Sequence, residues 1–234
     1  MGWTADHDLD GGHGQNISVG RGFLVEATAG TWLHGTASEH NTLYQYNFNN
    51  AANVFVGMQQ SETVYWQGIG SPSLTPAPWT TLSSYGDPDF TNCTTDDAQC
   101  RMGWFAQISG CSNMSLYGAG FWTFFNDNVG GCDSQGKGIC QTNAINIRNT
   151  SSLSWFGINV RDNINVIDNA RVALVTANTN PGGSGGFGTM SAVVGAFLLF
   201  STLGDPPPPP SPRPGQHEQA VYWVRVHKTE SGYV

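Results

Sequence analysis

Charged residues are scarce in this chain. Only 11% of its 234 residues are Asp, Glu, Lys or Arg, against about 25% in an ordinary globular domain. Seventeen acidic residues outnumber nine basic ones, and the formal net charge is −8. A surface of this sign repels phosphate backbones and anionic lipids. We therefore expect neither nucleic acid nor a membrane as a partner.

Helical periodicity is nearly absent as well. Short alternating runs of apolar residues recur instead, separated by Gly, Asn and Ser, and this pattern predicts strands joined by tight turns. The longest apolar run, within residues 192–203, is too short to cross a bilayer and is expected to be a last buried strand. The start of the chain has neither the basic nor the apolar region of a signal peptide. We expect the chain to begin inside a domain.

The five cysteines indicate two local disulfides. Cys93 and Cys100 bracket one short polar loop, and Cys132 and Cys140 bracket another. Cys111 lies in a strand-like run and is expected to be a buried thiol. Zinc spacings such as CxxC are missing, so we expect no metal and no other cofactor. Together with four Asn-x-Ser/Thr sequons, the cysteines favour a secreted origin.

Two successive segments repeat one pattern, each a short strand that ends in glycine and is followed by a glutamate. Gly35 and Gly57 are 22 residues apart, and Glu39 and Glu62 are 23 apart. A period of this size predicts a stacked solenoid. The Asn-rich turns favour a parallel β-helix over a sandwich or a propeller. Because neighbouring coils lie about 4.8 Å apart, the two glutamates are expected side by side on one face.

Paired carboxylates at short range are what glycoside hydrolysis needs. We expect the Glu39 and Glu62 carboxyl groups about 6.5–9.5 Å apart, as in inverting enzymes, with Trp32, Tyr65 and Trp66 nearby. The alternative is that both glutamates are surface carboxylates at coil corners. Ser38-Glu39-His40 has the residue types of a hydrolytic triad, but adjacent residues on a strand point to opposite faces, which argues against it.

The coils are interrupted once. Residues 68–100 are rich in proline and follow Glu62 directly, so we expect them to form a cleft wall. The expected organisation is a β-helix domain over residues 1–180 with this insertion, a Gly-rich stretch and last strand over 181–204, and a Pro-rich disordered tail over 205–234.

Several strings carry a family resemblance. They are Trp3-Thr-Ala-Asp-His-Asp-Leu-Asp10, Gly20-Arg-Gly-Phe-Leu-Val-Glu26, Trp32-Leu-His-Gly-Thr-Ala-Ser-Glu-His40, Tyr44-Gln-Tyr-Asn47, Gln60-Ser-Glu-Thr-Val-Tyr65 and Tyr117-Gly-Ala-Gly-Phe-Trp-Thr-Phe-Phe-Asn126. They resemble the fungal exo-β-1,3-glucanases of glycoside hydrolase family 55, over residues 1 to about 180.

The resemblance implies two right-handed parallel β-helices, of the pectate-lyase-like type, in a longer secreted chain with the active site between them. It implies exo-acting, inverting hydrolysis of laminarin-type β-1,3-glucan by a monomer. Glu62 would be the general acid and Glu39 would help position the attacking water. Tyr65, Trp3 and Asp6 would bind the sugar.

Three departures from the family qualify this expectation. The N-terminal β-helix is absent, and in the family it supplies a Gln and a Ser that hold the water. Val64 stands where the family usually has proline, and the tail after Gly204 has no family counterpart. We expect the C-terminal half of such an enzyme, incomplete by itself. The alternatives are a catalytically inactive β-glucan-binding module and a structural β-helix or adhesin.

Overall fold

The computed structural model describes residues 19–65, 75–126, 129–130, 140–169, 172–180 and 192–203. Strands dominate this part of the chain. They are β1 (Arg21–Val25), β2 (Thr31–Ala37), β3 (Tyr44–Asn49), β4 (Ala52–Glu62), β5 (Trp104–Ser109), β6 (Ser112–Trp122), β7 (Phe125–Asn126), β8 (Val129–Gly130), β9 (Gln141–Arg148), β10 (Ser151–Arg161), β11 (Asn163–Asn169), β12 (Val172–Thr176) and β13 (Ala192–Leu199). Two short 3-10 turns accompany them, η2 (Ser83–Tyr85) and η4 (Ala177–Thr179).

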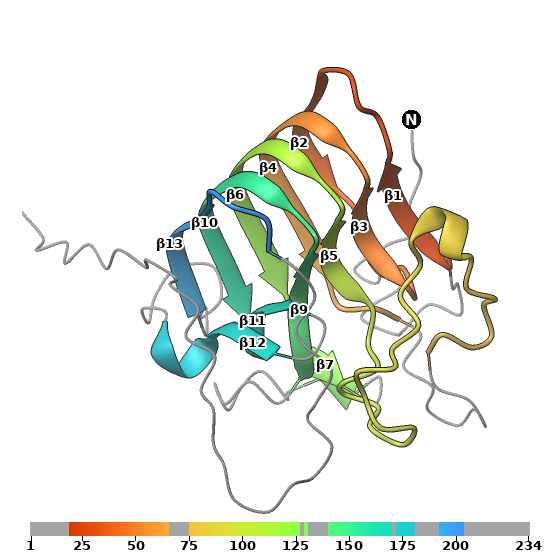
Figure 1. The fold of residues 1–234 in the computed structure, drawn as a ribbon. Coiled ribbons are helices and arrows are strands. Elements are labelled where there is room, and N and C mark those ends of the chain that lie inside the picture. The colour runs from red at the N-terminus through yellow and green to blue at the C-terminus, as the bar shows by residue number, and fades with distance from the viewer. Residues whose placement is uncertain are drawn as a thin grey trace, which may run out of the picture.

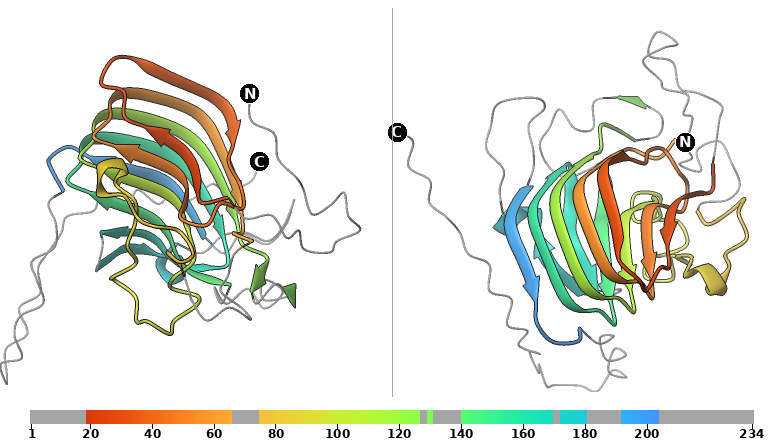
Figure 2. Two further views of the ribbon diagram at one scale, coloured as in Figure 1. Left: turned by 90° about the vertical axis from the view of Figure 1, so that its right-hand side faces the viewer. Right: turned by 90° about the horizontal axis from the view of Figure 1, so that it is seen from above.

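From β1 to β6 and from β9 to β11, successive strands alternate between two sheets, whereas β7 and β8 pair with each other in a separate two-stranded sheet. Sheet A has the order β1-β3-β5-β9-β11-β12, and sheet B has the order β13-β10-β6-β4-β2. The chain therefore stacks one strand on each sheet per coil, in chain order from red β1 to blue β13 (Figures 1 and 2). Pairing is parallel along both sheets except at β12 and β13, which close them antiparallel. The predicted all-β class is confirmed.

The register between coils corrects one part of the repeat. β2 pairs with β4 at an offset of 23 residues, for example Thr31 with Val54. The glutamates share this offset but the glycines do not, because His34 lies beside Gly57. A residue with left-handed backbone stacks on every coil of sheet B: Gly35, Met58, Gly118 and Gly157, with φ of 58°, 73°, 74° and 70°. Glycine takes this conformation without strain, which explains its recurrence.

The hydrophobic core lies between the two sheets. Side chains of sheet B that point inward are buried on each coil and form stacked rows: Val54, Val56, Met114, Leu116, Leu153 and Trp155. On the outer face the rings of His34, Phe55, Tyr117 and Phe156 form a ladder, with successive centroids 5.4, 5.6 and 5.2 Å apart. Only Tyr117 and Phe156 are register partners in this ladder. Gly57, which has no side chain, is the register partner of both His34 and Tyr117, and the Phe55 ring lies beside it and bridges the two.

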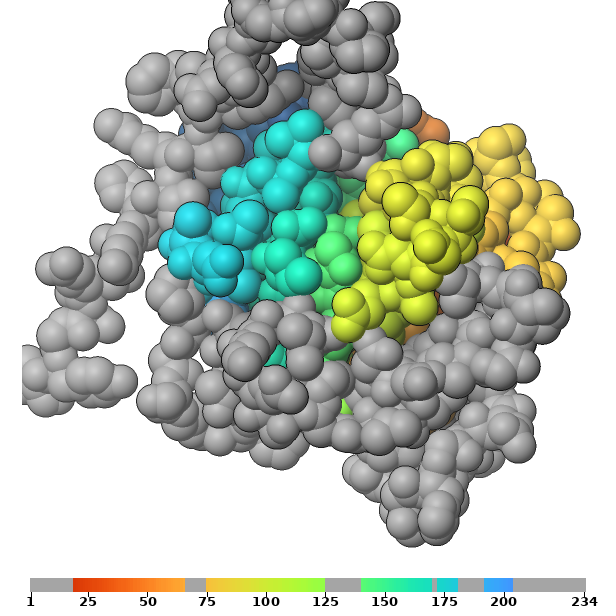
Figure 3. Space-filling view, turned by 90° about the horizontal axis from the view of Figure 1, so that it is seen from below, coloured from red at the N-terminus to blue at the C-terminus, as the bar shows by residue number. Residues whose placement is uncertain are grey.

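The described part of the insertion, residues 75–100, covers the outer face of sheet A. Arg21 of β1 forms an ion pair with Asp87, and Asn47 of β3 donates a hydrogen bond to the Tyr85 carbonyl at 2.9 Å. Phe90 packs in a second apolar cluster with side chains of sheet A. Figure 3 shows this segment in yellow as a block beside the later coils. Its role as a cleft wall stays a prediction.

The cysteines agree with the expected arrangement where the structure describes them. Cys93 and Cys100 form a disulfide with their Cα atoms 5.6 Å apart. Cys140 is also disulfide-bonded, and its expected partner Cys132 lies outside the described residues. Cys111 is a buried free thiol, and burial raises its pKa to about 11.

The last apolar run forms β13, which is half-buried. None of the helices in the described segments is long and apolar enough to cross a membrane. Several predictions concern residues outside the described part of the chain: the tail over 205–234, the Gly-rich stretch up to residue 191, and Trp3, Asp6 and Trp66. The expectations about them are therefore untested.

Candidate active site

Glu39 and Glu62 take equivalent positions on adjacent coils. Glu62 is the last residue of β4, and Glu39 lies two residues beyond the end of β2. The coils stay in register past Ala37, because the Ser38 amide donates to the Gln60 carbonyl at 3.1 Å. One carboxylate oxygen of Glu39 and one of Glu62 lie within 4.8 Å of each other. Their side chains remain 16% and 25% exposed. The structure thus brings the two glutamates together on an accessible face.

One oxygen of each carboxylate lies within 4.8 Å of the other. The expected separation of about 6.5–9.5 Å is measured between whole carboxyl groups, so it stays a prediction. Equivalent side chains on neighbouring coils start about 4.8 Å apart, which explains why the two glutamates meet.

His40 joins the pair. Its Nε2 lies 3.8 Å from Glu39 Oε2 and 3.7 Å from Glu62 Oε2. Strand alternation predicted that Glu39 and His40 point to opposite faces, and this was wrong. The two residues lie beyond the end of β2, and the left-handed backbone of His40, with φ of 62°, breaks the alternation.

The His40 ring is fixed on two sides. Its Nδ1 lies 2.6 Å from the Thr63 carbonyl oxygen. Because a carbonyl only accepts, the proton of the neutral ring sits on Nδ1. The ring also stacks on Tyr65, with centroids 3.9 Å apart and planes 5° from parallel. His40 is only 7% exposed. Its remaining nitrogen, Nε2, is the one that faces the carboxylates.

A buried amide pair holds the loop that carries Glu39. The Asn41 side chain donates to the Glu39 carbonyl at 3.0 Å and to Gln45 Oε1 at 2.9 Å. Gln45 returns a hydrogen bond to the Asn41 carbonyl at 2.7 Å and is fully buried on β3. The backbone of residues 38–41 is therefore set before any ligand arrives.

The row of equivalent positions continues across two further coils. Glu62 pairs with Trp122 of β6, and Trp122 pairs with Arg161 of β10. The position of the Trp122 ring requires Gly120, because a Cβ there would lie 2.0 Å from the ring. Sequence reasoning found neither Trp122 nor Arg161. The same register would have found them, but insertions between these coils change the spacing along the chain.

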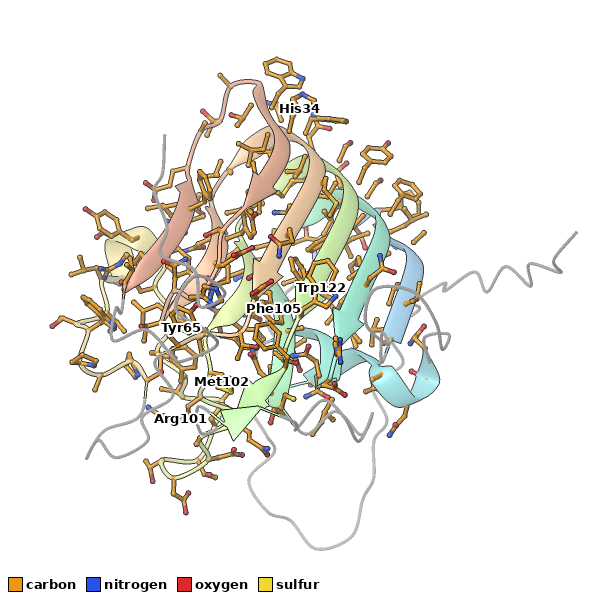
Figure 4. The ribbon with its side chains drawn as sticks, turned by 180° about the vertical axis from the view of Figure 1, so that it is seen from behind. His34, Tyr65, Arg101, Met102, Phe105 and Trp122 are labelled. Carbon is orange, nitrogen blue, oxygen red and sulfur yellow. A yellow bond between two sulfur atoms is a disulfide. The ribbon has the colours of Figure 1, made fainter. Side chains whose placement is uncertain are left out.

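Tyr65 is only 8% exposed, and His40 covers one face of its ring. In this arrangement the Tyr65 ring packs against the His40 ring and holds it in place. In Figure 4 His34 lies at the top of the coils, away from Tyr65 and Trp122. A sugar contact by Tyr65 stays a prediction.

Glu39, His40 and Glu62 are also the group whose ligand atoms lie close enough together to suggest a metal ion. The expected absence of a metal stays a prediction. A separate polar cleft lies between the insertion and sheet A. It is lined by Asp89, Asn92, Gln107, Asn146 and Arg148 among others, and it contains neither Glu39 nor Glu62.

Two carboxylates held close together on one accessible face are an arrangement that glycoside hydrolysis uses. Comparison with known proteins specifies the class further. Over 180 residues the chain is 37% identical to a probable glucan endo-1,3-beta-glucosidase of Arthroderma benhamiae, covering 76% of this chain and 20% of that protein. Over 161 residues it is 36% identical to a glucan 1,3-beta-glucosidase of Cochliobolus carbonum, covering 66% and 19%.

A third relative has a different name. Over 118 residues the chain is 42% identical to a non-secreted LysM effector of Penicillium expansum, covering 50% of this chain and 8% of that protein. The chain matches no protein-family model. It spans about a fifth of the length of the two glucanases. The predicted resemblance to fungal β-1,3-glucanases is confirmed.

Proposed function

We propose that this chain provides part of the active site of a glycoside hydrolase that cleaves β-1,3-glucan. The observation that carries the proposal is the convergence of Glu39, Glu62 and His40 on one accessible face, in a chain similar to fungal glucanases. We propose that the coils belong to a right-handed parallel β-helix within residues 1–180. We also propose that the whole protein is a secreted monomer that acts from the chain end, as the family resemblance implies.

In the proposed reaction Glu62 donates its proton to the glycosidic oxygen as the bond to the anomeric carbon breaks. Water adds to that carbon, and Glu39, negatively charged, helps to position it and takes up the proton that the water gives up. The net change is the addition of one water across one glycosidic bond. Because the chain spans about a fifth of its glucanase relatives, we propose that the rest of the protein supplies the opposite side of the site.

The proximity of the two carboxylates makes the stereochemical course a decisive measurement. Retaining enzymes hold their carboxyl groups about 5–5.5 Å apart, and the second carboxylate attacks the sugar directly. We propose inversion, on the family resemblance, and a water-positioning role for Glu39. Proton NMR of the first product should show the α-anomer. A β-anomer would make Glu39 a nucleophile and overturn its assigned role.

The proposed function is tested with laminarin and with an aryl β-glucoside whose leaving group needs no proton. Both are given to the chain alone and to the chain joined to the preceding part of the Arthroderma relative. We expect the joined protein to be the active form. Glu62→Gln should lower laminarin hydrolysis by about 10²- to 10⁴-fold and largely spare the aryl substrate. Glu39→Gln should lower both.

Glu26→Gln is the matched control, because Glu26 is an exposed acid outside the row. Equal losses on both substrates for Glu62→Gln would refute its role as the acid. One competing function is a β-glucan-binding module without activity. Binding of laminarin with no hydrolysis by either protein would establish that alternative. Neither binding nor hydrolysis would favour a structural β-helix or adhesin.

A further inference from the structure

We propose that His40 is the positioning residue through which Glu62 recovers its proton after each turnover. This inference rests on the proposed function, in which Glu62 is the acid. It goes beyond that function because it assigns a step that follows bond cleavage to a residue outside the carboxylate pair.

The first support is the fixed orientation of the ring. The Nδ1–H is committed to the Thr63 carbonyl at 2.6 Å, and Tyr65 stacks on one face at 3.9 Å. The neutral ring therefore presents a lone pair at Nε2. Any proton that the ring gains must appear on Nε2, on the side of the carboxylates.

The second support is the nearly equal distance from Nε2 to the two carboxylates, 3.7 Å to Glu62 and 3.8 Å to Glu39. Each gap exceeds a hydrogen bond by less than about 1 Å. Catalytic hydrogen bonds are often long before substrate binds. A glutamate side chain can rotate to close such a gap, whereas the stacked and hydrogen-bonded ring is held in place.

The proton transfer is balanced. Glu62 loses its proton to the leaving oxygen and becomes a carboxylate. Nε2 is buried, so its proton comes from Glu39, which has taken up the proton that the attacking water gives up. Nε2–H then passes this proton to Glu62, which restores all three groups. The titratable side chains that contact the ring include Glu39, Glu62 and Tyr65.

Solvent offers Glu62 a second route, because its side chain is 25% exposed. Loss of His40 should therefore slow turnover without abolishing it. We expect His40→Asn to lower kcat on laminarin by about 10-fold, below the range of about 10²- to 10⁴-fold for loss of an acid or base itself. The ratio kcat/KM should stay within about two-fold, because at low substrate Glu62 has time to recover its proton from water.

The variants are chosen to suit the left-handed backbone conformation of His40. His40 has φ of 62°, which Asn and Gly tolerate better than other residues. His40→Asn keeps this conformation and removes the titratable ring, and His40→Gly leaves a space for free imidazole. His34→Asn is the matched control, since His34 is exposed on the outer face of β2. Thermal unfolding of each variant checks that it folds.

Two readouts separate proton transfer from a structural role. The kcat of His40→Asn should rise with buffer concentration, and millimolar imidazole should restore His40→Gly, while the wild type and His34→Asn respond to neither. Nitrogen-15 NMR of the chain should show His40 in the Nδ1–H tautomer when neutral. The Nε2–H tautomer would overturn the inference without any activity measurement.

The outcomes distinguish this inference from the proposed function. If the joined protein with the wild-type chain hydrolyses no glucan, both the proposed function and this proton transfer are refuted. An active wild type with an unchanged kcat in His40→Asn refutes only the role of His40. Equal losses of kcat and kcat/KM, with no response to buffer or imidazole, would show that His40 has only a structural role and would overturn the inference.

Discussion

Asp168 of β11 makes the folded protein sensitive to pH at a place outside the candidate site. Its carboxyl group is only 6% exposed, and its Oδ2 has no hydrogen-bond partner in the described part of the chain. Burial disfavours the charged form and raises the pKa of Asp168 from its ordinary value of 3.8 to about 7.

The direction of the effect follows from comparing the folded and unfolded chains. The unfolded chain ionises Asp168 near pH 4, but the folded chain keeps it neutral up to about pH 7. The stability that the neutral carboxyl retains is fully present below about pH 4 and is lost as the pH rises through 7. A difference of about three pKa units corresponds to about 4 kcal/mol.

Asp168→Asn removes the charge and keeps the shape. We expect it to raise the free energy of unfolding by up to about 4 kcal/mol at pH 8 and by less than about 1 kcal/mol at pH 4. For a chain of this size the gain at pH 8 corresponds to about 8–16 °C in Tm.

The assay is thermal or urea unfolding of the wild type and the variant between pH 4 and pH 9. Asp96→Asn serves as the control, because Asp96 is exposed and its loss should change stability little at any pH. An Asp168→Asn variant whose advantage does not grow between pH 4 and pH 8 would refute the argument.

Three further predictions follow from the structure. The buried Cys111 thiol, with its pKa raised to about 11, should resist thiol reagents in the native protein and react in denaturant; rapid native labelling would contradict this. Replacing Cys93 and Cys100 by serine should lower the free energy of unfolding by about 2–3 kcal/mol in urea titrations, and an unchanged midpoint would show that this bond contributes nothing. Trp122→Ala should weaken laminari-oligosaccharide binding about 10-fold in calorimetry, consistent with the loss of one ring contact. Gly120→Ala should weaken it comparably, because the new Cβ displaces the ring, whereas normal binding by both variants would remove Trp122 from the site.

Local sequence patterns predicted much of the fold. Alternating apolar residues predicted the strands because a strand with one buried face must alternate. The run from residue 192 predicted β13, and the short loop between Cys93 and Cys100 predicted their disulfide. The 23-residue offset of Glu39 and Glu62 equals the register of β2 and β4. That offset predicted their proximity before any coordinates.

The same patterns failed where the backbone leaves the strand. Gly35 and Gly57 were aligned because they are the same residue type, but the ladder pairs His34 with Gly57. His40 was excluded by strand alternation, and its left-handed φ of 62° reverses that conclusion. Neither error was visible in composition or spacing, because both depend on the dihedral angles of single residues.

The sequence by itself determined the strand-forming segments, the short disulfide loop and the matching offset of the two glutamates, because each depends on residues close in the chain or on one simple period. Only the tertiary structure decided the row that continues from Glu62 to Trp122 and Arg161 and the position of His40 between the two carboxylates. These features depend on how coils of unequal length stack. Insertions alter the sequence spacing between coils but leave the spacing between strands at about 4.8 Å.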